Sequence, residues 1–321
     1  MPGMRSCGLP GVASSWYAKP LRATSMRFTE AFASSKGPII SFEVFPPKTE
    51  KGMEQLHEVL PRLVALRPDF MTVTYGAMGT TQARTLDIAA LIQRRFGIAT
   101  ASHLTCVGAS QEEINGILDR LSDSGIENIV ALRGDPPVGQ AKFTPPPGGF
   151  RYAKELVAHV RKTGRFGIAV AGYPEKHLEA PDMEADLQNL KRKVAAGGDV
   201  VVTQLFYDNA DFYRFEARLR VLGVTVPIVP GLLPIQSFAQ IKKITSLCGA
   251  KIPRDLLEQI ERTDSDEKAT QEIGARWAVE QCRDLLGHGV RGIHFYVLNK
   301  AAQMESILAQ VGRIPVARTG R

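Results

Sequence analysis

Two hydrophobic patterns alternate along the chain from residue 39 onward. Short runs rich in Val, Ile and Phe predict β-strands, and longer segments with apolar residues every three or four positions predict amphipathic helices. Strands that alternate with helices in this way are typical of a parallel sheet whose strands are joined by crossover helices.

We find eight such strand–helix units. The predicted strands cover residues 39–44, 70–75, 98–104, 128–132, 167–172, 200–205, 227–230 and 292–298. The predicted helices cover residues 51–66, 82–96, 110–124, 152–162, 182–196, 209–222, 235–246 and 267–286. Eight units in about 280 residues match a (β/α)8 TIM barrel of the α/β class. We therefore expect residues 37–321 to form one barrel domain. An open doubly wound sheet is the alternative, but no GxGxxG follows any strand.

Residues 1–36 have a different composition. They are rich in Ser, Ala, Gly and Arg, and no acidic residue precedes Glu30. An organelle transit peptide has this composition, and so does a disordered extension. A third possibility is that Met26 is the true start of the protein. We expect this segment to be a disordered N-terminal extension.

Composition narrows the class of protein. The 321 residues are 44% hydrophobic, and the formal charge of +7 comes from basic residues spread among nearly as many acids. We therefore expect no nucleic-acid partner, although the charge could steer anionic small molecules. Four separated cysteines without a CxxC pair indicate a reducing, cytoplasmic location. No apolar run is long enough to span a membrane, so we expect no membrane association.

Glu43 stands out within the first predicted strand. It lies inside an apolar run that Pro46 and Pro47 end, because proline cannot donate to a sheet ladder. Alternation places Glu43 on the same face as Ser41 and opposite Phe42. If both faces are covered, burial raises the pKa of Glu43, which suits a group that holds a proton and then gives it up. A Glu paired with Lys or Arg at a strand end is the equally weighted alternative.

Polar residues recur where the predicted strands end. In a (β/α)8 barrel this edge carries the chemistry. The residues are Glu43, Thr74, Tyr75, His103, Arg133, Asp135, Tyr173, His177, Gln204, His294, Tyr296 and Asn299. Each alone is more often a satisfied core group, but their recurrence at one edge predicts a functional site.

Two segments suggest ligand contacts. Gly134, between Arg133 and Asp135, allows close backbone approach, although a plain turn with an Arg–Asp pair also explains it. In the helix over 182–196, Arg192 and Lys193 could bind a phosphate or lie in solvent. We expect no metal site, because no acids or cysteines complete a ligand set around the histidines. A serine hydrolase is also disfavoured, since the chain has no GxSxG motif.

Nine motifs together suggest a family. They are SFEVFPPK, VTYGA, HLTC, ALRGD, YPEKH, NLKRK, TQLFYD, PGLLPI and HFYVLN. In this order they resemble methylenetetrahydrofolate reductase of the bacterial type, from about residue 39 to residue 299. The resemblance implies a barrel that holds non-covalent FAD, which NADH or NADPH reduces. It further implies reduction of 5,10-methylenetetrahydrofolate to 5-methyltetrahydrofolate, in one-carbon metabolism and methionine biosynthesis.

The resemblance also assigns roles to residues. Glu43 matches the general acid that opens the folate ring to an iminium cation, and Asp135 matches an acid that contacts flavin and pterin. Gln204 matches a residue that meets folate and nicotinamide in turn, and Lys300 stands where the family has an Arg thought to hold folate. Lys keeps the charge but loses the planar fork. The cofactor contacts implied are Thr74 on the nicotinamide side and, for FAD, Tyr75, Ala77, His103, Arg133, Gly134, Asp135, Ala153, Tyr173, His177, Ala180, Asp186, Asn189, Arg192 and Lys193.

Two rival functions stay open from the sequence. One is a catalytically silent barrel that binds folate or flavin, and the other is a flavin barrel that oxidises proline. The intact Glu43, Asp135 and Gln204 disfavour the first, and the motifs ALRGD and SFEVFPPK disfavour the second. The sequence does not distinguish NADH from NADPH, and we expect a homo-oligomer.

Overall fold

Eight parallel strands close into a barrel in the computed structural model, which describes residues 26–75, 80–135 and 143–312. The strands pair in chain order and the last pairs with the first. They are β1 (Ile39–Val44), β2 (Phe70–Val73), β3 (Ala99–Thr105), β4 (Asn128–Leu132), β5 (Gly167–Gly172), β6 (Val200–Leu205), β7 (Ile228–Leu232) and β8 (Gly292–Tyr296). The predicted (β/α)8 barrel is confirmed.

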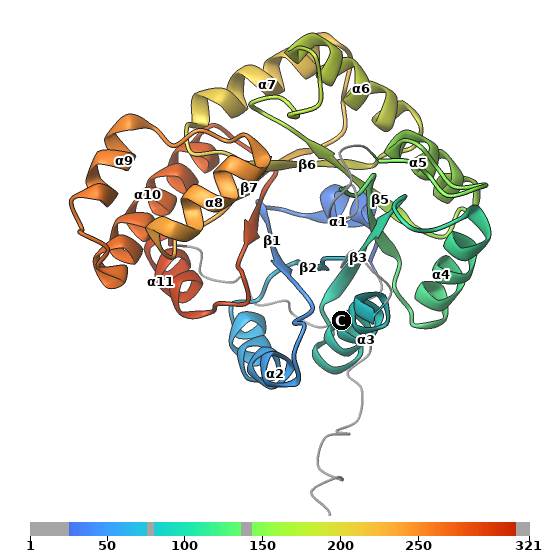
Figure 1. Ribbon diagram of the computed structural model, residues 1–321, viewed down its shortest axis with the longest axis horizontal. Coiled ribbons are helices and arrows are strands. Elements are labelled where there is room, and N and C mark those ends of the chain that lie inside the picture. Colours follow the sequence, from blue (N-terminus) through green and yellow to red (C-terminus); the bar gives the residue numbers. More distant parts are fainter. Residues whose placement is uncertain (1–25, 76–79, 136–142, 313–321) are drawn as a thin grey trace, which may run out of the picture.

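Helices surround the strand ring (Figure 1). They are α1 (Phe28–Ser34), α2 (Glu50–Ala65), α3 (Thr80–Phe96), α4 (Gln111–Asp123), α5 (Ala153–Lys162), α6 (Met183–Ala195), α7 (Asn209–Val221), α8 (Phe238–Cys248), α9 (Arg254–Glu261), α10 (Glu267–Gly287) and α11 (Ala302–Val311). The hydrophobic pattern predicted eight of these. It did not predict α1, α9 or α11.

The two faces of β1 have the environments that the alternation predicts. Ile40, Phe42 and Val44 are buried in the main core between strands and helices. Ser41 and Glu43 face the interior of the barrel, since both contact His294 there. The local sequence therefore directs one carboxyl group into the barrel near the carboxyl end of β1.

Side-chain caps fix where several helices begin. Asp182 precedes α6, and its carboxylate accepts a hydrogen bond from the Ala185 backbone N–H at 2.7 Å. Ser110 and Glu113 form a reciprocal capping box at the start of α4. Such caps satisfy N–H groups that have no partner within the helix. The cap on α6 matters for the site, because this helix lines one of its cavities.

The amino end of the barrel corrects one expectation. We expected residues 1–36 to be disordered, but α1 is an ordered helix that lies across the middle of the strand ring (Figure 1). Its Phe28 and Phe32 are buried, and the Phe28 ring lies 5.1 Å from that of Phe70. Asn128 holds the entry to the helix, accepting from Phe28 N at 2.9 Å and donating to Met26 O at 2.8 Å. Residues 1–25 lie outside the described part of the chain.

Small differences occur at the strand ends. The prediction ran β2 to residue 75 and β8 to residue 298, whereas the strands end at Val73 and Tyr296. Thr74 N and Val297 N still donate to backbone carbonyls of β1, and Leu298 and Asn299 then adopt left-handed backbone conformations. Within the described ranges, no helix is long and apolar enough to cross a membrane.

Candidate active site

A cavity of about 390 Å³ opens at the carboxyl ends of the strands, and we call it the central cavity. It is lined by residues from most strand ends and the loops that follow. Those with polar side chains are Glu43, Thr72, His103, Arg133, Asp135, Tyr173, His177, Gln204, His294 and Tyr296. The structure thus brings together most of the polar residues that the sequence placed at this edge.

Glu43 lies among polar groups in the lining of the central cavity. Its side chain is 17% exposed, and Oε2 lies 3.0 Å from His103 Nε2 and 3.6 Å from His294 Nε2. Thr72 donates a hydrogen bond to the same oxygen at 3.3 Å. The expected enclosure of Glu43 is therefore confirmed. Its partners are histidines, and not the Lys or Arg of the alternative interpretation.

The two histidines reverse the expected effect on the acid. Burial raises the pKa of Glu43, as the sequence predicted, but the charges and hydrogen bonds of His103 and His294 lower it. The attractive contributions win, and the pKa of Glu43 falls well below its usual range. The expectation of a raised pKa was therefore wrong for this arrangement. Desolvation is present as expected, but a low-dielectric site also strengthens the attraction of nearby cations.

His294 links Glu43 to a hydroxyl group. Its Nδ1 lies 2.8 Å from Ser41 Oγ, while its Nε2 faces the carboxylate. The imidazole ring can therefore bond the serine through one nitrogen and the acid through the other. His177 lies apart from this pair, packed edge-on against Tyr173 with ring centroids 4.6 Å apart. Among the described residues, no group of three His, Cys, Asp or Glu is placed to hold a metal ion.

The turn after β4 supplies a second acid to the central cavity. Asp135 is exposed and lines the cavity together with Arg133 and Gly134. Gly134 has a φ of +85°, and a Cβ there would lie 2.8 Å from Val107 Cγ2, so only glycine fits. The turn lacks the Arg–Asp ion pair that we considered. Arg133 instead pairs bidentately with Glu179, with Nη2 2.6 Å from Oε1.

A second cavity of about 450 Å³ lies beside α6, and we call it the α6 groove. It shares Leu132, Arg133, Ala171, Tyr173 and His177 with the central cavity, so the two are continuous. Nine residues that the family resemblance assigned to FAD line it, namely Arg133, Ala153, Tyr173, His177, Ala180, Asp186, Asn189, Arg192 and Lys193. The sequence therefore predicted most of the wall of this groove.

Lys193 is the least ordinary group in the α6 groove. The residue is partly exposed, and its ammonium donates to the Ala171 carbonyl and lies 5.8 Å from the centre of the Tyr173 ring. Burial lowers the pKa of Lys193 to about 8, and the charge of Asp186 offsets only part of this effect. Arg192 and Lys191 are exposed, and Arg192 donates to Asn189 at 3.0 Å. The groove thus holds a desolvated cation suited to an anionic group.

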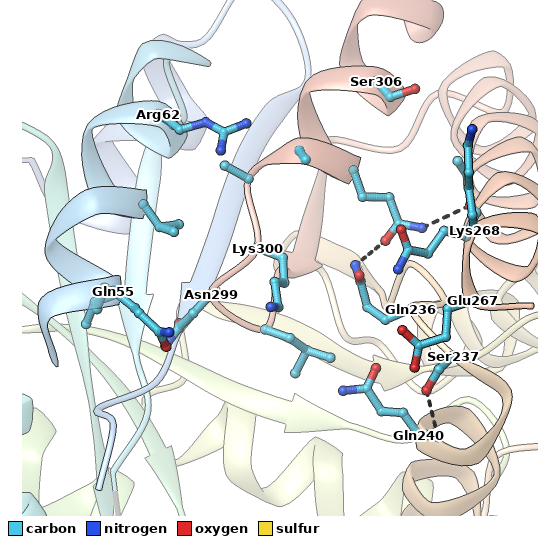
Figure 2. A pocket seen from close by; sticks show the side chains of 18 of the residues that line it. Gln55, Arg62, Gln236, Ser237, Gln240, Glu267, Lys268, Asn299, Lys300 and Ser306 are labelled. Carbon is cyan, nitrogen blue, oxygen red and sulfur yellow. Dashed lines mark hydrogen bonds between the residues drawn. The ribbon is translucent and has the colours of Figure 1, made fainter. Parts of the chain in front are cut away.

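Lys300 does not line the central cavity. It lies in a larger cavity of about 1100 Å³, which we call the outer groove, with walls from α2 on one side and α8, α10 and α11 on the other. Figure 2 shows Lys300 in the middle of this groove, between Asn299 and Gln236. Phe45 and Leu298 line both the outer groove and the central cavity. A ligand that contacts both Glu43 and Lys300 must therefore pass these two side chains.

Two predicted cofactor contacts among the described residues do not line either inner cavity. Thr74 and Tyr75 follow β2 and do not contribute to the described lining of the central cavity or the α6 groove. The pKa of Tyr75 is raised to about 12, chiefly by burial. Ala77 lies outside the described residues.

The sequence reasoning missed two contacts of the site. Thr72 was read as a strand residue, although alternation from Thr74 back to Thr72 would have placed both on one face. Glu179 was unmarked inside the YPEKHLEA segment, and no sequence pattern indicates its pairing with Arg133. His294 and Tyr296 were noted at the strand end but had no assigned role.

Known proteins resemble this chain over nearly its full length. The chain is 42% identical over 292 residues to methylenetetrahydrofolate reductase (NADH) 1 of Zea mays, and the aligned region covers 88% of this chain and 49% of that protein. It is 38% identical over 287 residues to 5,10-methylenetetrahydrofolate reductase of Escherichia coli (strain K12), covering 89% of this chain and 95% of that protein. The chain thus spans about half the length of the plant relatives.

A solved structure shows the same fold at low identity. It is a protein from Clostridium thermocellum described as binding two copies of 5-methyl-5,6,7,8-tetrahydrofolic acid. The TM-score is 0.61 at 15% identity, covering 88% of this chain and 96% of that one. The profile of the family named methylenetetrahydrofolate reductase matches residues 27–312. This chain therefore belongs to the methylenetetrahydrofolate reductase family.

Proposed function

We propose that this chain reduces 5,10-methylenetetrahydrofolate to 5-methyltetrahydrofolate, with NADH or NADPH as reductant and non-covalent FAD as cofactor. The relatives in plants and bacteria carry the name of this activity. The observation that carries the proposal is the enclosed carboxyl of Glu43 in a cavity that Asp135 and Gln204 also line. A cytoplasmic location and a homo-oligomer stay predictions, and the reaction would serve one-carbon metabolism and methionine biosynthesis.

The shape of the two inner cavities supports FAD as the proposed cofactor. A flat ring system would occupy the central cavity beside Glu43, and the diphosphate and adenosine would follow the continuous α6 groove. The desolvated ammonium of Lys193 supports this assignment, because an anion beside it would offset the cost of burying its charge. When bound, the flavin supplies hydride transfer between nicotinamide and folate. The residues of this chain position both substrates and handle the proton.

The proton is the part of the reaction that Glu43 would manage. Opening of the five-membered folate ring needs an acid close to the substrate nitrogen. Contacts with His103 and His294 lower the pKa of Glu43 and so favour its ionised form in the ligand-free site. If a bound ligand engages His103, the largest attractive contribution is lost and burial raises the pKa of Glu43. Asp135 would then stabilise the cationic substrate.

The folate must reach two cavities. The pterin would lie in the central cavity, and the carboxylate-bearing end would pass Phe45 and Leu298 into the outer groove. Lys300 would meet a carboxylate there. A lysine offers a point charge in place of the bidentate fork of arginine, so we expect this contact to depend on ionic strength.

Half-reactions of the Glu43→Gln variant test the proposal. The unmodified protein should be yellow, release FAD on denaturation, and show ping-pong kinetics, because both substrates would use one flavin face. In Glu43→Gln we expect NADH or NADPH still to reduce the flavin, while reoxidation by methylenetetrahydrofolate slows by about 100-fold or more. Stopped-flow absorbance of the flavin measures both steps.

Glu112→Gln serves as the matched control, since Glu112 is exposed on α4. It should leave both half-reactions unchanged. Equal slowing of both steps in Glu43→Gln would remove Glu43 from the role of acid. A protein that cannot take up flavin would reject the proposed function itself.

A further inference from the structure

The turn after β8 has an unusual backbone. Leu298 and Asn299 are consecutive residues with φ values of +48° and +54°. A left-handed conformation costs a residue with a side chain roughly 1–2 kcal/mol, although Asn tolerates it better than Leu. Such a conformation persists only where the surroundings enforce it, and it is a reason to look for a function.

The Asn299 side chain enforces this turn by binding the end of β1. Its Oδ1 accepts from Phe45 N at 3.1 Å, and its Nδ2 donates to Phe45 O at 2.9 Å. The regular pairing of β1 with β8 ends at Glu43 and Tyr296. Pro46 and Pro47 then deprive the exit of β1 of two backbone donors. The Asn299 carboxamide therefore replaces the missing ladder hydrogen bonds and holds the segment after β1 to the turn after β8. We call this pair of hydrogen bonds between Asn299 and Phe45 the clamp.

The clamp lies at the boundary between two cavities. Asn299 binds Phe45 and directly follows Leu298, and both Phe45 and Leu298 line the central cavity and the outer groove. On one side, Glu43 is two residues before Phe45. On the other, Lys300 directly follows Asn299 in the outer groove (Figure 2). The clamp thus determines how the acid and the cation lie relative to each other.

We propose that Asn299 is a positioning residue for folate, which ties the exit of β1 to the turn after β8 so that Glu43 and Lys300 meet opposite ends of one substrate. The inference rests on the proposed function. Asn299 acts through Phe45 and Lys300, and its own polar groups are occupied by the Phe45 backbone. It should therefore affect the carboxylate-bearing half of folate and not nicotinamide.

The variant Asn299→Gly separates the clamp from the backbone conformation. Glycine adopts the left-handed conformation without steric cost, so the turn can persist while both hydrogen bonds are lost. Calorimetry on the flavin-loaded protein should show that the Kd of 5-methyltetrahydrofolate rises on the order of tenfold, as expected for two lost hydrogen bonds. The Kd of 5-methyltetrahydropteroate, which lacks the glutamate, should stay within about twofold of the unmodified value.

Two further measurements separate positioning from general support of the fold. Flavin reduction by NADH should stay within about twofold in Asn299→Gly. Because Asn299 acts through Lys300, adding Asn299→Gly to Lys300→Ala should weaken folate binding little beyond Lys300→Ala alone. Asn299→Asp keeps an acceptor for Phe45 N and loses the donor, so we expect a smaller rise of about threefold. Asn299→Asp tests the same proposal if Asn299→Gly does not fold.

Several results would overturn the proposal. In Asn299→Gly, these are an unchanged Kd of 5-methyltetrahydrofolate, an equal rise in Kd for 5-methyltetrahydrofolate and 5-methyltetrahydropteroate, or slower flavin reduction by NADH. In the double variant, it is a rise in folate Kd equal to the product of the rises in Asn299→Gly and Lys300→Ala. Failure of the proposed function would look different, because the unmodified protein would then bind no 5-methyltetrahydrofolate, or would bind it without reducing methylenetetrahydrofolate. If the unmodified protein binds and reduces folate while Asn299→Gly matches it, only the positioning role is lost.

Discussion

The two ends of the barrel use the same eight strands for opposite purposes. At the amino end, small residues such as Ala99, Ala101 and Ala169 leave room that Phe28 and Phe32 of α1 fill. At the carboxyl end, the interior positions carry Glu43 with its histidines, and the surface opens into three cavities. One end is a packed apolar core, and the other keeps charged groups partly out of water.

This difference separates stability from chemistry. Apolar packing stabilises a fold in proportion to the area it buries, whereas buried ionisable groups cost free energy unless they are paired. We therefore expect substitutions at the amino end to change the free energy of unfolding. Substitutions at the carboxyl end should mainly change proton affinities and ligand binding.

The largest effect should come from removing the plug at the amino end. Phe28→Ala deletes a buried ring that is 5% exposed and packs on Phe70, so we expect a loss of about 3–5 kcal/mol in the free energy of unfolding. Denaturant titration measures this loss. At a temperature where the variant stays folded, its kcat/KM should remain within about twofold, because the site lies at the other end.

Thr29→Ala is the control for this change, since Thr29 is the exposed neighbour on the same helix. It should cost less than about 0.5 kcal/mol. If Phe28→Ala proved equally mild, the view of α1 as a plug would be wrong. If it abolished folate reduction in the folded state, the two ends would not be independent.

A smaller effect should follow from changing the neighbours of Glu43. In the unmodified protein, the contact of His294 with the Glu43 carboxylate lowers the pKa of Glu43. His294→Asn can keep a hydrogen bond to Ser41 but loses this contact. The pKa of Glu43 should therefore rise. Because the acid must be protonated to act, the alkaline limb of the folate half-reaction should move up by about one pH unit. Stopped-flow rates across pH measure the limb.

Ser41→Ala is the matched control, since it removes the partner of His294 Nδ1 and leaves the contact of His294 with Glu43. In Ser41→Ala, the alkaline limb of the folate half-reaction should move much less. A downward shift in His294→Asn would contradict the account of how the histidines act on Glu43.

The sequence predicted where the strands lie because each contains a local apolar pattern. Pro46 ends β1, and apolar runs alone define strands such as β4 and β5, whose predicted bounds match the structure. The helix α1 was missed because its surroundings are rich in Ser, Ala and Arg. The spacing of Phe28, Ala31 and Phe32 was the signal that could have found it, since these three share one helix face.

The site was predicted in its residues but not in its electrostatics. Alternation and prolines placed Glu43 inside the barrel, yet the sign of its pKa shift depends on His103 and His294, which distant strands bring to it. The same reason explains Lys300, which adjoins the site in sequence but lies in the outer groove. Contacts between distant segments are fixed by the closure of the barrel, and no local pattern contains them.

The smallest predicted effect concerns Lys193 and pH. The pKa of Lys193 is about 8 in the folded protein and close to the ordinary lysine value of 10.5 when the chain is unfolded. Between these values the unfolded chain binds the proton that the folded chain has released, so the free energy of unfolding rises with pH. For the flavin-free protein we expect a gain of about 1 kcal/mol between about pH 8 and pH 9 from this group. Bound FAD should cancel it, because an anion beside the ammonium restores the charged form.

Lys193→Met isolates this contribution. The variant keeps a similar stem without the charge, so the difference in free energy of unfolding between it and the unmodified protein should shrink as pH rises from about 7 to about 9. Denaturant titrations of both flavin-free proteins at each pH measure the difference. Lys193→Met should also bind FAD more weakly. A difference that stayed constant with pH would mean that Lys193 keeps its proton in the flavin-free groove, and that the carboxyl end carries less desolvation cost than its geometry indicates.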